Sequence, residues 1–150
     1  MVNSNMAQPL IQPSNAGDEI QKLKQVAKII YPNIYTKNEK FSELDAQDVK
    51  RELQYLPQII NLLEWALRNV NKLRAGYGDE LRYYDDKTGN AIRVVLCEGR
   101  GSSAEVVPYP NENTIYILSC EGPVVKVIRN VKRALKETLA RYTRAQQILY

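Results

Sequence analysis

The sequence predicts an α+β fold, mainly α, in which a helical bundle carries a small antiparallel β insertion between its helices. Apolar residues recur every three or four positions, as in amphipathic helices, over residues 18–78 and again over 122–150. Between these segments, residues 79–121 change to short β-branched runs separated by turn residues, which is typical of strands. Residues 1–17 are rich in Asn, Gln, Ser and Pro, so we expect a flexible N-terminal tail there.

Helices are expected first in the N-terminal part of the chain. The first begins near Asn15 or Asp18, both good capping residues. It ends before Pro32, because proline disfavours helical geometry in the residue that precedes it. The second starts at Ser42 or Asp45, which resemble a capping box with a shorter acid.

The next helical region, Gln58 to Ala75, is the most apolar in the chain and is expected to be central. Pro57 either kinks the helix before it or occupies the first turn of a new one. Gly76 suits the left-handed residue that commonly follows the end of a helix.

Four short strands are expected in the insertion. Short turns join them, and we therefore expect an antiparallel meander, in which each strand pairs with its neighbour along the chain. The predicted strands are 81–85, 91–97, 104–107 and 114–119, with Pro108 and Pro110 ending the third.

The last predicted helix carries the basic character of the protein. The chain has 150 residues, 21 basic and 17 acidic, and a net charge of +4. Seven bases and one acid lie after residue 122, which leaves 14 bases and 16 acids before it. The final segment therefore has a charge of +6 and the rest of the chain −2. At about 100° per residue, most of these bases lie opposite the apolar face of the helix.

Regularly spaced Lys and Arg along one helix face can neutralise successive phosphates, which is the electrostatic footprint of nucleic-acid binding. Acidic partners at i,i+4 are nearly absent from this helix. A solvated helix face is the alternative interpretation, and membrane-surface binding is weaker because the apolar face lacks Trp and Phe. The predicted nucleic-acid-binding residues are Lys126, Arg129, Lys132, Arg133, Lys136, Arg141 and Arg144.

Composition argues against an enzyme. The chain has no His, which removes the commonest general base and the commonest metal ligand. Two Cys do not make a four-ligand zinc site by themselves. No catalytic residue, metal or cofactor is therefore predicted. An acidic cluster matches no calcium loop and is better explained by turn chemistry, with a small metal-dependent nuclease as the minor alternative. Its members are Asp79, Glu80, Asp85 and Asp86.

Cys97 and Cys120 are interpreted as two buried thiols in a reducing cytosol, and we expect a cytoplasmic protein. A bridge between them is the alternative, as in the cytosolic proteins of hyperthermophiles. The N-terminal residues do not resemble a secretory signal. No apolar run approaches the roughly 20 residues that span a bilayer, so no membrane partner is expected.

Two weaker patterns lie in the β insertion. The segment 99–103 superficially resembles a phosphate cradle, but no Lys-Ser/Thr follows it, so a hairpin loop is expected. Basic and aromatic residues of the strands could form a surface for single-stranded nucleic acid, although Tyr is also simply favoured in strands. These residues are Arg82, Tyr83, Tyr84, Arg93, Arg100, Tyr109 and Tyr116.

In size, order of elements and charge, the chain resembles the small subunit of the archaeal type I-A CRISPR interference complex (Cascade). Three segments carry the resemblance: an apolar helical stripe, the strand 93–96 and the basic helix from Lys126 to Arg144. The stripe consists of Ile59, Leu63, Ala66, Val70 and Leu73.

The resemblance implies a non-catalytic subunit, present in several copies, of an RNA-guided complex in antiviral defence. In such complexes base pairing to the guide RNA reads the sequence, and protein subunits hold the backbones and the displaced strand. The implied partners are a CRISPR backbone subunit and guide RNA, with single-stranded DNA and self-association through the β insertion as further possibilities. The alternative function is a protein-only structural or regulatory module, such as a viral virion or polymerase-binding protein.

Overall fold

The computed structural model describes residues 16–32, 34–35, 41–97, 104–120 and 124–150. The chain divides into two compact units. One contains the residues up to Gln54 together with Arg144–Tyr150, and the other is Tyr55–Thr143. Most of the expected tail, the Gly-rich segment 99–103 and the residues directly before the last helix lie outside the described residues.

The first unit is built on two helices, α1 (Ala16–Ile30) and α2 (Glu43–Leu53). The predicted capping box is confirmed. The backbone N–H of Asp45 donates to Ser42 Oγ at 3.1 Å, and the backbone N–H of Ser42 donates to Asp45 Oδ2 at 2.9 Å. These reciprocal bonds satisfy donors that a helix start leaves unpaired, so α2 begins at this point of the chain.

The second unit contains α3 (Leu56–Asn69) and most of α4 (Val124–Leu149). Pro57 lies in the first turn of α3, which decides between the two predicted roles. The helix ends earlier than expected, with a 3₁₀ turn η2 at Val70–Lys72. The prediction for Gly76 is therefore wrong, since this glycine follows a short strand and has no positive φ.

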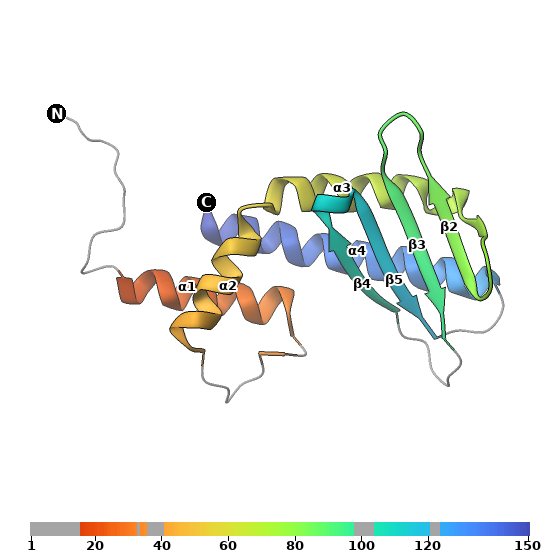
Figure 1. Cartoon of the computed structure of the whole chain (residues 1–150). Coiled ribbons are helices and arrows are strands. Elements are labelled where there is room, and N and C mark those ends of the chain that lie inside the picture. The colour runs from red at the N-terminus through yellow and green to blue at the C-terminus, as the bar shows by residue number, and fades with distance from the viewer. Residues whose placement is uncertain (1–15, 33, 36–40, 98–103, 121–123) are drawn as a thin grey trace. The chain divides into compact units, whose positions relative to one another are not determined.

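Five strands form one mixed sheet in the order β1-β2-β3-β5-β4 (Figure 1). The strands β3 and β5 are parallel neighbours at its centre, and the other pairs are antiparallel. A short 3₁₀ turn, η3, connects β4 to β5. The bounds are Arg74–Ala75, Glu80–Tyr84, Ala91–Leu96, Ala104–Tyr109 and Thr114–Ser119 for β1 to β5, and Pro110–Glu112 for η3.

The α+β content is as predicted, but the helical bundle with a small insertion is wrong, and so is the meander. The reason lies in which strands are most apolar. The inward isoleucines and valine of β3 and β5 are at most 1% exposed, so these two strands occupy the centre of the sheet. β4 contains Pro108, which cannot donate a ladder hydrogen bond, and it lies at the edge.

The helices α3 and α4 cover one face of this sheet (Figure 1). The strands alternate between buried and more exposed residues, as expected when only one face is covered. Trp65 of α3 stacks on Tyr83 of β2 with ring centroids 6.0 Å apart. The core residues of this face are Leu81, Ile92, Val94, Ile115 and Ile117, and those of α4 include Val127, Val131 and Leu135. No described helix covers the opposite face, which is called the open face below (Figure 1).

Cys97 and Cys120 form a disulfide, so the interpretation as free thiols is corrected. The two residues follow β3 and β5, which are adjacent and parallel, and their Cα atoms are 4.8 Å apart. The backbone N–H of Cys97 also donates to the carbonyl of Ser119 at 3.0 Å. Strand pairing therefore brings the two sulfurs together, and the bridge covalently links the ends of the two central strands.

Glu80 is a buried carboxylate beside the open face, only 7% exposed. Arg93 Nε donates to its Oε2 at 2.8 Å, and Arg82 Nε lies 3.6 Å from Oε1. The hydrogen bond from Arg93 is the main reason that the pKa of Glu80 lies below its ordinary value. Gly76 passes so close that a Cβ there would lie 2.6 Å from Oε1, so the β1–β2 connection needs a glycine at this position.

None of the described helices combines the length and the apolar character that crossing a membrane requires.

We expect the disulfide to stabilise the fold by about 3 kcal/mol, because it closes a loop with a sequence separation of 23 residues. Reduction, or the double variant Cys97→Ser/Cys120→Ser, should lower the melting temperature by roughly 6–12 °C. Thermal unfolding followed by circular dichroism measures the change. The double variant serves as its own control, since reductant should not affect it. A wild-type chain that melts at the same temperature with and without reductant contradicts the prediction.

The buried Glu80 predicts a specific sensitivity to acid. Its folded pKa is lowered, so its stabilising contribution is present above the ordinary value of 4.5 and is lost as the pH falls through the folded pKa. We expect Glu80→Gln to be less stable than wild type at pH 7 and to lose less stability on acidification to about pH 3. Urea unfolding at both pH values measures this, with Glu64→Gln, an exposed position of α3, as the matched control. Equal acid sensitivity of wild type and Glu80→Gln contradicts it.

Candidate nucleic-acid interface

The strongest candidate site is a row of exposed bases on α4, here called the α4 ridge: Lys126, Arg129, Lys132, Arg133 and Lys136. At 100° per residue these side chains fall within one third of the helix circumference. They extend over ten residue steps, or about 15 Å of helix. The ridge is therefore a compact line of five positive charges on one element.

The opposite side of α4 explains why the ridge faces outward. Val127, Val131 and Leu135 are fully buried and lie about 120–160° around the helix from the centre of the ridge. The guanidinium of Arg133 is held against the helix, because its Nη2 donates to Oδ1 of the buried Asn130. The core contacts of the helix thus determine which residues solvent can reach.

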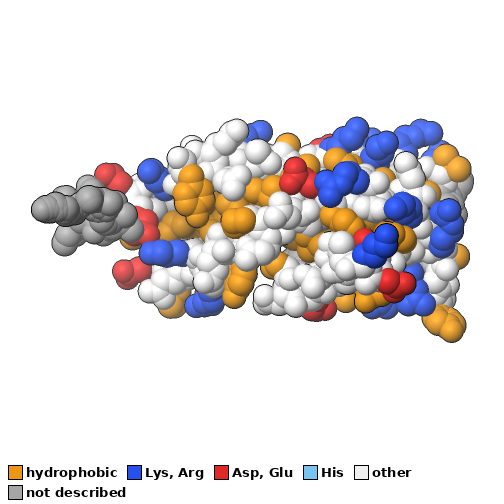
Figure 2. Space-filling view, turned by 90° about the horizontal axis from the view of Figure 1, so that it is seen from above, with side chains coloured by type: hydrophobic (Ala, Val, Ile, Leu, Met, Phe, Trp, Pro, Cys, Tyr) orange, Lys and Arg blue, Asp and Glu red, His pale blue; other side chains and the backbone are white. Residues whose placement is uncertain are grey.

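No residue of the α4 ridge has an ion pair within the described part of the chain. The only acid of the helix is Glu137. Figure 2 shows Lys and Arg side chains gathered at the end of the view where η2 and the start of α4 lie. The ridge charges are therefore available to an anionic partner at no cost in broken ion pairs.

The structure separates the other two predicted residues from the ridge. Arg141 is half-buried, lies on the flank of the helix and donates to Thr138 Oγ1 at 3.2 Å. Arg144 is exposed but belongs to the last turns of α4, which are part of the first unit. Five of the seven predicted residues are thus brought together.

The open face of the sheet carries most of the predicted basic and aromatic residues. Tyr109 and Tyr116 pack edge to face at 5.1 Å, and the guanidinium of Arg93 lies 5.9 Å from the ring of Tyr116. Tyr83 instead points to the covered face, and Arg100 lies outside the described residues. The members on the open face are Arg82, Tyr84, Arg93, Tyr109 and Tyr116.

Sequence reasoning missed one residue of this face, Arg74, because it assigned that residue to a helix. The strand register aligns Arg74 with Arg82, and Arg82 with Arg93. In the sequence, the only sign that Arg74 does not belong to the helix was the polar composition after Leu73. Acidic residues offset the positive charge of this arginine row, however. Glu80 forms ion pairs with Arg82 and Arg93, and Glu105 and Glu112 lie towards β4. The open face therefore has little net charge.

The acidic cluster does not converge on a cation site. Asp85 accepts from the Lys87 backbone N–H and from Thr88 Oγ1, both at 3.0 Å, and the bond from Lys87 is the main cause of its lowered pKa. Gly89, with φ of +77°, completes the turn. Among the described residues no group of three His, Cys, Asp or Glu side chains could hold a metal ion. The predicted turn is confirmed.

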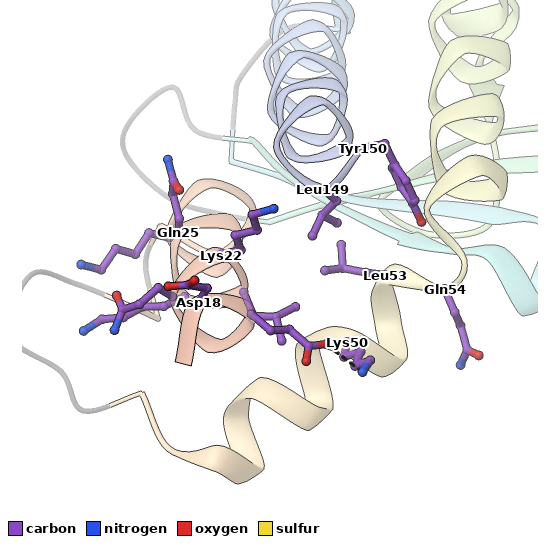
Figure 3. A pocket seen from close by; sticks show the side chains of 13 residues that line it. Asp18, Lys22, Gln25, Lys50, Leu53, Gln54, Leu149 and Tyr150 are labelled. Carbon is purple, nitrogen blue, oxygen red and sulfur yellow. Dashed lines mark hydrogen bonds and ion pairs between the residues drawn. The ribbon is translucent and has the colours of Figure 1, made fainter. Parts of the chain in front are cut away.

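The first unit has its own hollow, between α1, α2 and the last residues of α4 (Figure 3). Leu53 and Leu149 contribute apolar surface to it. Lys50 reaches across to α1, where its Nζ lies 2.8 Å from Glu19 Oε1. The remaining Lys of the lining are Lys22, Lys24 and Lys28, and the other acid is Asp18. This hollow is open and mixed in charge, and it presents no nucleophile–base pair.

Comparison with known proteins gives no match: no family model, no curated protein and no solved structure corresponds to this chain.

Proposed function

We propose that this protein is a non-catalytic nucleic-acid-binding protein and that the α4 ridge is its contact with the phosphate backbone. The observation that carries the proposal is the set of five exposed bases without ion pairs on one third of one helix. Phosphates bound there would release their counterions, which is the main source of sequence-independent affinity.

The ridge supports backbone contact without base reading. Its side chains are Lys and Arg alone, with no aromatic ring among them on which a base could stack. Duplex DNA carries one negative charge per about 1.7 Å of helix axis. A ridge of about 15 Å therefore meets enough phosphates to engage every one of its basic side chains. We therefore expect weak sequence preference and strong dependence on salt.

Membership of a CRISPR surveillance complex, as its small subunit, is a narrower form of this proposal. The helical bundle on which the resemblance partly rested is overturned by the five-stranded sheet. Size, the apolar stripe of α3 and the basic last helix still support it. In that setting the α4 ridge would hold guide RNA, target or displaced single-stranded DNA beside a CRISPR backbone subunit.

Removing positive charge from the α4 ridge should weaken its binding to nucleic acid, and the salt dependence of the affinity should report how many phosphate contacts are lost. The triple variant Arg129→Gln/Lys132→Gln/Lys136→Gln removes three phosphate contacts and spares Arg133, which holds Asn130. We expect at least tenfold weaker binding to a mixed-sequence single strand at about 0.1 M salt. The slope of log affinity against log salt should become shallower by about 2. Fluorescence anisotropy with a labelled oligonucleotide, single-stranded and as a duplex, measures both.

The matched control is Lys28→Gln/Arg51→Gln/Lys87→Gln, which removes the same charge from three exposed positions outside the α4 ridge. It should keep its affinity and its salt slope. If both triple variants bind equally weakly, the contact is diffuse and not the ridge.

The narrower proposal predicts what copurifies with the chain. A tagged chain expressed in its native host should retain a CRISPR backbone subunit and guide RNA, and ribonuclease or ridge neutralisation should weaken this association. Mass spectrometry and RNA sequencing of the eluate identify the partners. An acidic protein that is retained after nuclease treatment, with no RNA or DNA, would instead support the protein-only structural or regulatory module.

A further inference from the structure

The outer edge of β4 carries main-chain groups that bond to no other described residue. Their direction follows from the bonds of the neighbouring strand. The backbone N–H of Ala91 donates to the carbonyl of Asn113, and that of Cys97 to Ser119, so the odd-numbered residues of β5 bond to β3. The even-numbered residues of β5 therefore bond to β4, where their register partners are Glu105, Val107 and Tyr109. The residues of β4 whose main-chain groups point outwards are Ala104, Val106 and Pro108.

This outward edge can bond one further strand. Ala104 and Val106 each offer an N–H and a carbonyl, whereas Pro108 offers its carbonyl alone. An added antiparallel strand would therefore make two hydrogen bonds at each of the first two residues and one at Pro108. Because the missing donor lies at one end of the set, the other outward groups remain available. Antiparallel addition also continues the pairing of β4 with β5.

The open-face side of the same edge is acidic. Glu105 and Glu112 are exposed and form no ion pair with any described residue. The hydroxyl of Tyr116 donates to Glu112 Oε1 at 3.5 Å, and the ring of Tyr109 packs edge to face against Tyr116. A shallow hollow between the two acids has an apolar and aromatic lining that includes Val107, with no basic residue among its described members. An approaching strand therefore meets carboxylates and aromatic rings, both of which attract cations.

We propose that β4 binds an extended segment of a partner protein as a further antiparallel strand, and that this segment carries two basic side chains four residues apart. In an added strand, the residues opposite Glu105, Val107 and Tyr109 have their side chains on the open face. They form non-hydrogen-bonded pairs, which bring the side chains closest, with Cβ atoms about 4.5–5.5 Å apart. The segment therefore has the pattern basic–x–apolar–x–basic. One basic residue lies beside Tyr109 and Glu112, and the other beside Glu105.

Charge distinguishes this partner from other occupants of the edge. Nucleic acid is disfavoured, because its phosphates would meet Glu105 and Glu112. A second copy of β4, paired antiparallel about Val106, would place Glu105 opposite Val107, and β4 contains no basic residue to pair with either acid. Arg93 on β3 lies about 14 Å from the added strand, beyond the Debye length of about 8 Å at physiological salt. The arginine row therefore does not repel a basic segment.

The small size of the site predicts weak binding that is selective by charge. An edge with three outward residues offers far less surface than the roughly 800 Å² per partner of a stable interface. Each cross-strand ion pair changes the affinity by about 1.4- to 5-fold, so two pairs contribute much of the preference. The α4 ridge lies on a helix that covers the opposite face of the sheet (Figure 1). The inference is therefore independent of the proposed nucleic-acid function.

A labelled peptide, Gly-Ser-Arg-Thr-Val-Thr-Lys-Ser-Gly, tests the proposal by fluorescence anisotropy with the full chain. We expect saturable binding that the double variant Glu105→Lys/Glu112→Lys weakens at least about fivefold, because like charges then meet. Both residues are exposed, so this variant should fold. The matched control, Glu64→Lys/Asp86→Lys, makes the same charge change at exposed positions outside the edge and should bind like wild type. Equal weakening by the two variants, or no binding up to about 1 mM, overturns the proposal.

Two further measurements test the pairing itself. A peptide with Glu in place of both basic residues should bind Glu105→Lys/Glu112→Lys more tightly than wild type. Amide shifts of the isotope-labelled full chain, titrated with the basic peptide, should be largest over Ala104–Tyr109, because the outward N–H groups gain hydrogen bonds. Shifts confined to other elements overturn the assignment to this edge. Dimerisation of the chain that the basic peptide does not reverse would assign the edge to a second copy and overturn the proposal.

Discussion

The parallel pairing of β3 with β5 is the interaction on which the rest of the second unit depends. It places the four most deeply buried apolar strand residues side by side, Ile92 and Val94 with Ile115 and Ile117. That apolar centre is the surface that the helices cover. It also brings the ends of the two strands together, so the disulfide forms where the pairing already holds its cysteines. A slip of one residue would turn these side chains to the open face, which burial forbids.

The α4 ridge is a consequence of this core. A helix that buries Val127, Val131 and Leu135 has no freedom to rotate, so its opposite side is fixed towards solvent. The proposed binding surface and the buried surface are two sides of one amphipathic helix. The same constraint separates Arg141 from the ridge, because its position on the flank lets it bond to Thr138. The amino-acid composition of α4 alone does not distinguish its seven basic residues from one another.

Glu80 has a similar double role on the sheet. Its carboxylate is buried, so it requires the charges of Arg82 and Arg93 beside it. The pairing orients the two guanidiniums on the open face and neutralises part of their charge. This is the physical reason for placing the proposed phosphate contact on α4, whose basic residues have no ion-pair partner among the described residues.

The sequence by itself determined the local elements. The capping box at Ser42, the place of Pro57 and the turn at Asp85 follow from short-range chemistry, and the structure confirms each or decides between the alternatives. The concentration of bases on the last helix was equally visible, because 3.6-residue periodicity needs no tertiary contact.

Tertiary structure decided the strand order, the layer arrangement and the state of the cysteines. The alternation of apolar and polar residues along a strand shows that one face of the strand is buried. It does not show which strands are neighbours in the sheet, because that depends on which strands take the most buried central positions. The meander and the bundle were wrong for this reason. The sequence left the disulfide undecided, because Cys97 and Cys120 become neighbours only when β5 pairs with β3. Pairing of β5 with β4 alone would not bring the two cysteines together.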